Sequence, residues 1–470
     1  MAWSSRVRRL LLAGGLLLRA AAGAQSPYKI DTPDDIRESA RTLAYDMMLF
    51  YVGNHSGGIP GILPGPPPHG PYYWWEGGAM MGTYIDYWRW TGDSSYNHVV
   101  MEGMLHQVGE NQDYQPANHT LSLGNDDQGF WGMSAMLAAE NKFPNPPADK
   151  PQWLALAQAV WNTMADPQRH DEKCGGGMRW QIPFSNSGYG YKNTIANGCF
   201  FNIGARLARY TGNSSYADYA EKTWDWLWAV NYIDHKSYHV YDGGHVNKNC
   251  TDVNTATFSY NAAVLLQGAA FMYNFTRGEK KWEERVRKLT ESTLPFFFPK
   301  GIAYEVHCEA RNPRLCTPDM ITYKGYTHRW LAVVTQVAPF TRDTIMPVLR
   351  SSTEAAIKQC TGGASGRACG FYWSSGAFVD PLQDKTSGAG EAMNVLAAVS
   401  SLLVDNVEPP VSHDTGGISK GDPGAGGGGF VNGEKPLKPI TAADRAGAGI
   451  VTFLMLSGTV VAFAWMSFFE

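Results

Sequence analysis

Residues 90–96 read Trp-Thr-Gly-Asp-Ser-Ser-Tyr, and residues 210–216 repeat them as Tyr-Thr-Gly-Asn-Ser-Ser-Tyr. A looser copy, Phe-Thr-Arg-Gly-Glu-Lys-Lys-Trp, occupies residues 275–282. An apolar, helix-like run precedes each copy and another follows it. In the two closer copies the glycine suits the end of one helix, and the Asx-Ser-Ser after it suits the cap of the next. The repeated turn therefore predicts hairpins of two helices.

The copies lie about 120 and 65 residues apart, near multiples of 60, and further hairpins fit the gaps. The expected helical segments are residues 28–51, 77–88, 96–108, 129–141, 151–164, 200–209, 216–230, 262–273, 282–294, 327–337, 344–359 and 388–404. Strand-like alternation is scarce. Six hairpins predict an all-α (α/α)6 barrel, a six-hairpin toroid in which inner and outer helices alternate. An open α-solenoid of the same hairpins is the alternative.

Both ends of the chain carry targeting patterns. Arginines, a short apolar run and small residues follow one another in residues 1–24, which predicts a secretory signal peptide. At the other end, residues 446–469 are nearly free of charge and long enough to cross a bilayer. A polar spacer and a glycine run precede them, an order typical of a GPI-attachment signal.

We therefore expect the catalytic domain in residues 25–406 and a flexible Gly/Pro/Ser-rich stalk with the GPI attachment region in residues 407–433. Asn432 is the candidate attachment residue, and residues 434–470 form the signal propeptide that is removed on maturation. An ordinary tail anchor is the alternative for this end of the chain.

The remaining composition agrees with the secretory route. Seven cysteines fit an oxidising compartment, and no spacing typical of zinc occurs, so neither a metal nor a cofactor is expected. Cys308/Cys316 and Cys360/Cys369 are close enough for local bridges; of the other three cysteines one thiol must stay free, and the pairing stays open. Each N-glycosylation sequon predicts an exposed position if it is used. The sequons begin at Asn54, Asn118, Asn213, Asn249 and Asn274.

The charge and aromatic content narrow the class of partner. A net charge of −4 does not indicate a protein that binds nucleic acid. Charged residues make up only 17% of the chain, whereas aromatic residues make up 13%, with sixteen tryptophans. Aromatic rings offer flat apolar faces that suit the C–H faces of sugars. Although most of these rings belong to the core, the balance favours a carbohydrate partner.

The adjacent carboxylates Asp126 and Asp127 are the most informative candidates. They stand in Gly-Asn-Asp-Asp-Gln-Gly-Phe-Trp, at the expected start of an inner helix. Capping alone explains the chain's other adjacent pair, Asp34 and Asp35, after Thr32-Pro33. Glycosidic cleavage needs one carboxyl group to protonate the leaving oxygen and a second to act as nucleophile or base. The glycine-rich and aromatic setting therefore favours catalysis for Asp126 and Asp127.

Other candidates cluster at the expected starts of the inner helices, positions that converge on one face of such a ring. The proposed substrate-binding residues are Trp75, Glu76, Asn125, Asn193, Asn197, Tyr260, Asn261, Lys324, Arg329 and Trp373. The aromatic members suit stacking on sugar rings, and the Asn and Lys side chains suit hydrogen bonds to hydroxyls. A capping or packing role explains any one of them equally well. His328 is expected to be a satisfied polar residue rather than a metal ligand.

Residues 124–131 (Gly-Asn-Asp-Asp-Gln-Gly-Phe-Trp), 192–201 (Lys-Asn-Thr-Ile-Ala-Asn-Gly-Cys-Phe-Phe) and 260–261 (Tyr-Asn) resemble glycoside hydrolase family 76. The whole layout resembles its fungal branch, the GPI-anchored Dcw- and Dfg-type cell-wall proteins. The resemblance covers about residues 28–406 and implies an (α/α)6 barrel with endo-acting, retaining cleavage of α-1,6-mannan. It assigns the nucleophile to Asp126 and the general acid/base to Asp127.

The resemblance also implies that the protein works as a transglycosidase, moving GPI-anchored mannoproteins through their GPI-core glycan onto cell-wall glucan. The expected protein is thus a mannan endo-1,6-α-mannosidase, held by a GPI anchor at the outer face of the plasma membrane and the cell wall. The sequence does not decide between hydrolysis and transfer. Two alternatives remain: a non-catalytic glycan-binding wall protein on the same fold, and a structural α-solenoid adhesin without a central acidic groove.

Overall fold

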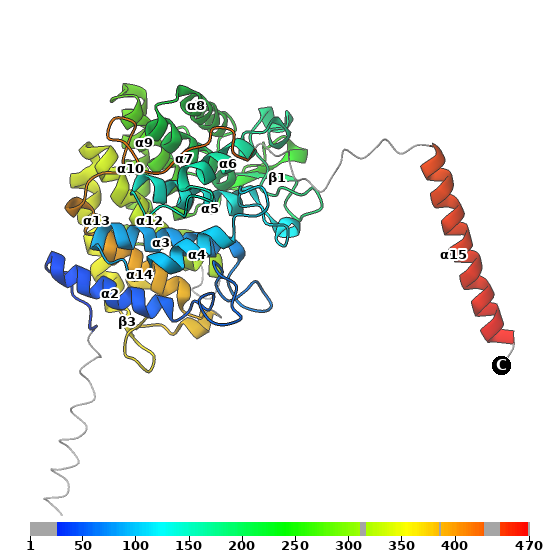
Figure 1. Ribbon diagram of the computed structural model, residues 1–470, viewed down its shortest axis with the longest axis horizontal. Coiled ribbons are helices and arrows are strands. Elements are labelled where there is room, and N and C mark those ends of the chain that lie inside the picture. Colours follow the sequence, from blue (N-terminus) through cyan, green and yellow to red (C-terminus); the bar gives the residue numbers. More distant parts are fainter. Residues whose placement is uncertain (1–25, 311–315, 385–386, 427–441, 469–470) are drawn as a thin grey trace, which may run out of the picture. The chain divides into compact units, whose positions relative to one another are not determined.

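The computed structural model describes residues 26–310, 316–384, 387–426 and 442–468. Within them, six helices form an inner ring and six others cover it from outside (Figure 1). The inner helices are α3 (Trp74–Thr91), α5 (Asn125–Glu140), α7 (Thr194–Thr211), α9 (Ser259–Phe275), α12 (Pro318–Val337) and α14 (Ala389–Ser401). The outer helices are α2 (Pro33–Met48), α4 (Asn97–His106), α6 (Trp153–Met164), α8 (Ser214–Ala229), α10 (Lys280–Phe297) and α13 (Arg342–Lys358).

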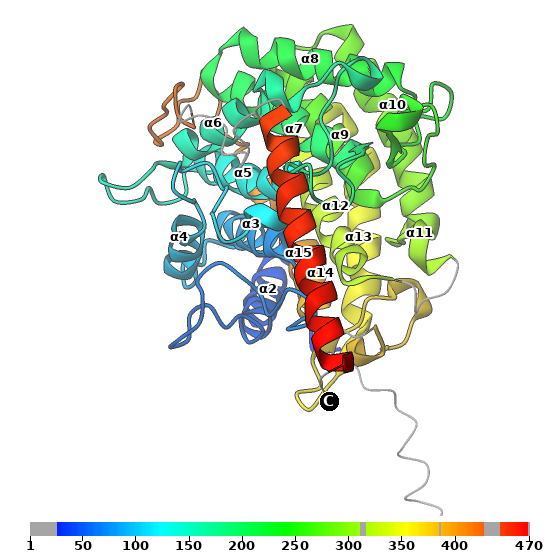
Figure 2. The same ribbon diagram turned by 90° about the vertical axis from the view of Figure 1, so that its right-hand side faces the viewer.

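The inner ring is closed. Each inner helix packs against the next one along the chain, and α14 packs back against α3. The turned view in Figure 2 shows α8 and α10 on the outside of α7 and α9. Ring closure confirms the predicted (α/α)6 barrel and excludes the open solenoid.

The repeated turn makes the hairpins as expected. Gly92 and Gly212 end α3 and α7 in the left-handed conformation, with φ of 78° and 74°. Asp93 and Asn213 then accept hydrogen bonds from the backbone N–H two residues on, both at 3.0 Å. A glycine avoids the Cβ clash of a left-handed backbone, and an Asx side chain satisfies a free N–H. These two properties turn the chain from an inner helix to an outer one.

All the inner helices except α14 begin earlier than their apolar runs suggest. α7 begins at Thr194, six residues before the expected start, and α12 at Pro318, nine residues before. Because an outer helix separates each inner helix from the next, the inner helices run in the same direction and their N-termini gather at one end of the barrel. Short ladders occur as well: β1 (Tyr191–Asn193) pairs with β2 (Gly243–His245), and β3 (Cys360–Gly362) pairs with β4 (Ala368–Cys369).

The segment after residue 406 corrects the predicted stalk. Its backbone crosses the C-terminal ends of the inner helices: Val411 N–H donates to the carbonyl of Glu140 at 2.9 Å, and His413 N–H to that of Arg209 at 3.0 Å. Farther along, Asn162 of α6 donates to the carbonyl of Ala425 at 2.8 Å. Residues 407–426 are therefore a strap of the catalytic domain, because buried helix ends supply the partners for its backbone.

A truncation tests the strap. Removing residues 407–470 leaves the buried Arg209 without the carbonyls of Pro410 and Val411, which it binds at 2.8 and 3.0 Å. Since each unsatisfied buried donor costs about 1–3 kcal/mol, we expect a melting temperature lower by several degrees in calorimetry. Truncation after Gly426 keeps the strap and is the matched control. Equal melting temperatures for both truncations would contradict the assignment.

The disulfides agree with the expected local bridges. Cys308 pairs with Cys316 and Cys360 with Cys369. The open pairing resolves as Cys174–Cys250, which leaves Cys199 as the buried free thiol among the described residues.

Four sequon asparagines, Asn54, Asn118, Asn213 and Asn249, are exposed. Asn274 differs: it is half-buried, accepts from Arg209 at 2.7 Å and donates to the carbonyl of Val337 at 3.0 Å. Its amide is engaged at the end of α9, so this sequon lacks the exposed position that its use for glycosylation would need.

The targeting predictions fall mostly outside the described part of the chain. The predicted signal peptide, residues 1–24, and the attachment candidate Asn432 lie outside the described residues. The helix α15 (Ala442–Phe468) belongs to a second compact unit, separate from the barrel. No helix in the described ranges is both long and apolar enough to cross a membrane.

Candidate active site

A cavity of about 620 Å³ opens at the end of the barrel where the inner helices begin. The first turns of α3, α5, α9 and α12 form its floor, and loops before α3, before α5 and between α6 and α7 form its walls. The lining residues are Pro66, Pro67, Tyr73, Trp74, Trp75, His119, Ser122, Leu123, Asp126, Asp127, Phe130, Trp180, Gln181, Ser187, Tyr260, Asp319 and Tyr323. Both adjacent carboxylates thus face the same cavity.

Asp126 and Asp127 occupy the first turn of α5, where backbone N–H groups have no helical acceptor. Asp127 Oδ2 accepts from the N–H of Gly124 at 2.6 Å, and Asp126 Oδ1 accepts from the N–H of Asp127 at 3.1 Å. Both carboxylates therefore cap the start of the helix, which is the role that the sequence assigned to Asp34 and Asp35. In contrast to Asp34 and Asp35, they also line a cavity, so capping here fixes the orientation of the carboxyl groups at the site.

The two carboxyl groups are close together. A Cβ placed on Gly124 would lie 2.4 Å from Asp126 Oδ1 and 2.9 Å from Asp127 Oδ2. These two oxygens are consequently no farther apart than the roughly 5–5.5 Å that separates the carboxyl groups of retaining glycosidases. Glycine at position 124 is what makes the approach possible.

Burial sets the protonation of the pair. It raises the pKa of Asp126 to about 7, against the lowering effect of backbone N–H groups and of the Trp180 side chain. Burial and then the neighbouring Asp126 carboxylate hold the pKa of Asp127 well above its ordinary value. When Asp126 is ionised, its negative charge therefore favours the protonated form of Asp127. This combination suits a nucleophile followed by a general acid.

These pKa values predict a bell-shaped pH profile. Cleavage that uses Asp126 as an anion and Asp127 as an acid gains rate as pH rises through about 7, the pKa of Asp126. It loses rate again above the pKa of Asp127. We expect these two limbs in kcat/KM measured between pH 4 and 10 on a manno-oligosaccharide. Asp34→Asn, at the exposed adjacent pair, should leave the profile unchanged, and a flat profile for the unmodified protein would contradict the assignment.

Aromatic side chains cover much of the cavity. The rings of Tyr260 and Tyr323 are stacked with centroids 3.9 Å apart, and Trp75 packs on Phe130 at 4.5 Å. The ring of His119 lies over Trp74, and burial lowers the pKa of that imidazole. Such rings combine an apolar face with polar edges, as sugar rings do. Tyr73 and Trp180 are the exposed aromatics of the lining, at 44% and 37%.

The structure brings only some of the predicted residues to this cavity. Asp126, Asp127, Trp75 and Tyr260 line it. The other candidates are buried and do not line it. They are Glu76, Asn125, Asn193, Asn197, Asn261, Lys324, Arg329 and Trp373.

Half of these buried residues support the start of a helix or the wall of the cavity. Glu76 caps α3 by accepting from the N–H of Tyr73 at 2.6 Å, and Asn193 caps α7. Asn125 binds Arg169 and the carbonyl of Arg179. Asn197 holds the N–H and carbonyl of Met178 at 2.8 and 3.0 Å. These side chains position the helix starts and the cavity wall.

The remaining candidates stabilise the barrel interior. Lys324 pairs with Glu309 at 2.7 Å, and Arg329 pairs with Asp86 at 2.8 Å. The indole of Trp373 donates to the carbonyl of Gly370 at 3.2 Å. Asn261 lies buried beside Asp242. None of them lines the cavity, which corrects their prediction as groove residues. His328, bonded to the Lys324 carbonyl and to Ser352, is the satisfied polar residue that was expected.

Sequence analysis missed Asp319 and the wall residues Trp180 and Gln181. Asp319 sits in the first turn of α12 after Thr317 and Pro318, and burial raises its pKa to about 6. Its negative charge also raises the pKa of Asp127. The Thr-Pro-Asp pattern at 317–319 matches the Thr-Pro-Asp at 32–34, which was recognised as a helix start. That signal was available, whereas nothing in the sequence places residues 180 and 181 beside residue 126.

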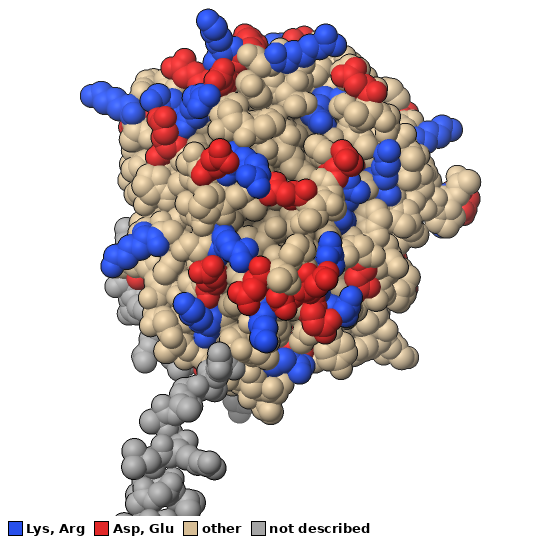
Figure 3. All heavy atoms as spheres, turned by 90° about the vertical axis from the view of Figure 1, so that its left-hand side faces the viewer, with Lys and Arg blue, Asp and Glu red and all other residues tan. Residues whose placement is uncertain are grey.

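The site as a whole combines an acid, a nearby anion and aromatic surfaces in an open cavity. Among the described residues, no cluster of His, Cys, Asp and Glu has the arrangement of a metal site. On the face drawn in Figure 3, basic and acidic side chains are interspersed rather than gathered by sign. The pair of carboxyl groups in an aromatic cavity suits acid-assisted displacement at a sugar carbon.

Comparisons with known proteins agree with this geometry. The sequence model of glycosyl hydrolase family 76 matches residues 35–414. Mannan endo-1,6-alpha-mannosidase DCW1 of Saccharomyces cerevisiae is 42% identical over 441 residues, covering 93% of this chain and 94% of the relative. DFG5 of the same yeast, which carries the same enzyme name, is 40% identical over 90% of each chain.

Solved structures give the same fold. Dfg5 from Chaetomium thermophilum, crystallised in complex with glucosamine, is 70% identical, with a TM-score of 0.84 over 85% of this chain and 97% of that one. The GH76A α-1,6-mannanase from Salegentibacter sp. HEL1_6 shares the fold at 17% identity, with a TM-score of 0.61 over 78% and 99%. The protein is accordingly a glycoside hydrolase, and the chain belongs to glycoside hydrolase family 76.

Proposed function

We propose that the protein is an endo-acting, retaining mannan endo-1,6-α-mannosidase, and that Asp126 and Asp127 carry the reaction. The observation that supports this most directly is the pair of carboxyl groups held close together at the floor of an aromatic cavity. Relatives about 40% identical over nine-tenths of the chain carry the name mannan endo-1,6-alpha-mannosidase. An inactive variant of the Salegentibacter enzyme has been crystallised with α-1,6-mannotriose.

The reaction has two steps. A carboxylate oxygen of Asp126 attacks the anomeric carbon while Asp127 gives its proton to the departing glycosidic oxygen, which leaves a mannosyl ester on Asp126. Asp127, now an anion, then takes a proton from an incoming hydroxyl, whose oxygen displaces Asp126 from the anomeric carbon. Two inversions at one carbon retain its configuration. Because Asp127 Oδ2 is engaged by the N–H of Gly124, the transferable proton belongs on Oδ1.

The identity of the incoming hydroxyl decides the biological outcome. Water gives hydrolysis, whereas a glucan hydroxyl gives transfer of the glycan to the cell wall. We propose the second as the cellular role, with the core glycan of a GPI anchor as donor. The glucosamine complex of Chaetomium Dfg5 supports an amino-sugar-containing donor. The carboxyl groups of Asp126, Asp127 and Asp319 give the cavity an acidic character that suits an ammonium group.

The proposed site of action follows from the same layout. A signal peptide in residues 1–24 and a GPI anchor attached at Asn432 would hold the barrel at the outer face of the plasma membrane and in the cell wall. The yeast relatives, which match over nine-tenths of this chain and are named mannan endo-1,6-alpha-mannosidase, support a placement next to mannan.

Product analysis tests the proposal. The purified protein is incubated with α-1,6-mannotetraose or a synthetic GPI-core glycan, with and without a β-glucan oligosaccharide. Expected products are shorter α-anomers at early times, seen by NMR, and a mixed oligosaccharide when the acceptor is present. Binding without any product would favour the non-catalytic glycan-binding alternative, and a β-anomer as first product would overturn the retaining mechanism. Hydrolysis with no transfer would overturn the cellular role alone.

A further inference from the structure

The wall of the cavity beside Asp126 comes from the loop between α6 and α7, and this loop is joined directly to the catalytic turn. The backbone carbonyl of Trp180 accepts a hydrogen bond from the N–H of Asn125 at 2.8 Å. The N–H of Ile182 donates a hydrogen bond to the carbonyl of Leu123 at 3.1 Å. Gly124 and Gln181 form an antiparallel bridge between these bonds. The residue before the nucleophile and the tryptophan beside it are thus held in fixed register.

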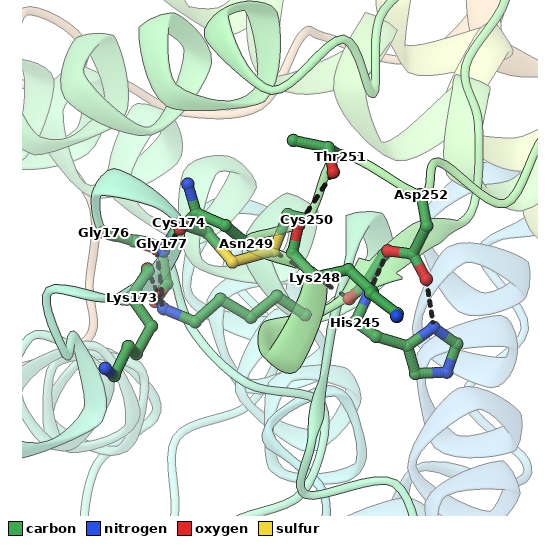
Figure 4. The surroundings of a disulfide bond; sticks show 12 residues. Lys173, Cys174, Gly176, Gly177, His245, Lys248, Asn249, Cys250, Thr251 and Asp252 are labelled. Carbon is green, nitrogen blue, oxygen red and sulfur yellow. Dashed lines mark hydrogen bonds and ion pairs between the residues drawn. A yellow bond between two sulfur atoms is a disulfide. The ribbon is translucent and has the colours of Figure 1, made fainter.

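The base of this loop is anchored on both sides. The buried ammonium of Lys192 donates to Asp171 and to the carbonyls of Lys173, Gly176 and Gly177 at 2.7–2.9 Å. The Cys174–Cys250 disulfide ties the same turn to the segment that follows β2 and carries Asn249 (Figure 4). The side-chain oxygen of Asn249 also accepts a hydrogen bond from the N–H of Cys174 at 3.0 Å. A loop fixed in this way holds its side chains in one arrangement.

Within the loop, the indole of Trp180 is held against the cavity. Gly188 lies behind its ring, so close that an added Cβ would stand 2.5 Å from the indole. Trp180 also contributes to the cavity lining, and this large apolar side chain is 37% exposed. Trp180 and Asp126 line the same cavity, and the indole N–H is the only polar group of that side chain, which lowers the pKa of Asp126 as a hydrogen-bonding neighbour. An indole N–H can only donate, so the carboxylate is the acceptor.

We propose that Trp180 is a positioning residue for the nucleophile: its indole N–H orients the Asp126 carboxylate and favours its ionised form, and Gly188 provides the room that this orientation needs. This inference rests on the proposed nucleophilic role of Asp126. A neutral donor suits this role, because it stabilises the negative charge on Asp126 before attack, and Asp126 loses that charge when its oxygen bonds to the anomeric carbon. A lysine or arginine in the same place would hold the anion too strongly for attack.

Trp180→Phe tests the proposal, because it keeps an aromatic ring and removes only the N–H donor. Losing a hydrogen bond to a charged group corresponds to a fall in kcat of about 10- to 100-fold, with KM nearly unchanged because the ring still lines the cavity. The acidic limb of the kcat/KM profile should move to higher pH, since the donor lowers the pKa of Asp126. A merely structural residue would not move that limb.

Gly188→Ala is the complementary variant, because it keeps the donor and displaces the ring. The new methyl group meets the indole, and the backbone at this position has a φ of +92°. We expect the same direction of change in kcat and in the acidic limb. Phe184→Leu is the matched control, since Phe184 belongs to the same loop, is 54% exposed and does not line the cavity.

Asp126→Asn is measured in parallel, so that failure of the inference and failure of the proposed function can be told apart. If Asp126→Asn retains turnover, the nucleophile assignment fails. If Asp126→Asn is inactive while Trp180→Phe keeps both its kcat and its acidic limb, the inference about Trp180 alone is wrong. A loss of kcat in Trp180→Phe without movement of the limb also overturns it, because it would indicate disturbed packing.

Discussion

Asp126→Asn and Asp127→Asn should each lower kcat/KM on an α-1,6-manno-oligosaccharide by roughly 10³-fold or more, for different reasons. The first removes the oxygen anion that bonds to the anomeric carbon, and the second removes the proton that the leaving oxygen needs. Both replacements keep the shape of the side chain. In Asp127→Asn the amide oxygen can still accept from the N–H of Gly124, which the native carboxylate binds at 2.6 Å.

An aryl glycoside with a good leaving group separates the two roles. Such a substrate departs without protonation, so Asp127→Asn should form the glycosyl intermediate rapidly and then accumulate it, visible as a burst of the released phenol. Asp126→Asn should show no burst. Equal residual rates for both variants on both substrates would contradict the assignment of separate roles.

Stability provides the control that these losses are not unfolding. The pKa of each carboxyl is higher in the folded protein than in an unfolded chain, where Asp titrates near about 3.9. A raised pKa means that the folded state binds the proton more tightly, so stability falls as pH rises from about 4 through the folded value. An asparagine does not ionise. We therefore expect both variants to melt at a higher temperature than the unmodified protein at pH 8, and at a similar one near pH 4.

The exposed pair gives the opposite control. Asp35 accepts from the N–H of Thr32 at 3.1 Å as part of a capping box at the start of α2. Asp35→Ala should lower the melting temperature through the loss of that cap, which is worth about 1 kcal/mol, and should leave kcat/KM unchanged. The two adjacent pairs thus separate capping alone from capping combined with catalysis.

The sequence predicted the fold well where local chemistry repeats. The turn at residues 90–96 contains its own glycine and its own cap, so its two copies identify hairpins without any knowledge of distant contacts. The disulfides Cys308–Cys316 and Cys360–Cys369 were predictable for the same reason, since their partners are eight and nine residues apart. The pairing of Cys174 with Cys250, 76 residues away, depends on the folded barrel.

The groove residues were predicted less well because apolar periodicity marks the middle of an inner helix rather than its start. An inner helix of a closed barrel is buried on all sides, so its polar first turns look like a loop in the sequence. Lys324 and Arg329 were assigned to the start of an inner helix expected at residue 327, whereas α12 already begins at Pro318 and carries them into the interior. The true first turn holds Asp319, which lines the cavity.

The predicted stalk was wrong for a related reason. Glycine, proline and serine are common in flexible linkers, but they also suit an irregular strand that binds through its backbone. In residues 407–426 the backbone itself supplies the contacts, for instance the N–H of Asp422, which donates to Gln158 at 2.7 Å. Composition does not reveal such partners, because the partner residues belong to helices that are more than 200 residues away in sequence.

Gly124→Ala should nearly abolish activity while leaving the protein folded. The backbone at Gly124 has φ of −90° and ψ of 160°, values that alanine adopts without strain. The new methyl group, however, would stand 2.4 Å from Asp126 Oδ1 and 2.9 Å from Asp127 Oδ2. Both distances are shorter than a van der Waals contact, so both carboxyl groups must turn away.

The displacement of these groups determines the size of the effect. A shift of about 1 Å in a reacting group reduces rate roughly 10²-fold, and here the nucleophile and the acid shift together. We expect kcat/KM to fall by at least that factor, with a melting temperature within a few degrees of the unmodified protein. Gly190→Ala is the matched control, because a Cβ at that position meets no atom within 4 Å and Gly190 belongs to the loop that forms the cavity wall. If Gly124→Ala were as active as Gly190→Ala, the two carboxyl groups would not need their close approach, and the retaining mechanism built on it would lose its structural basis.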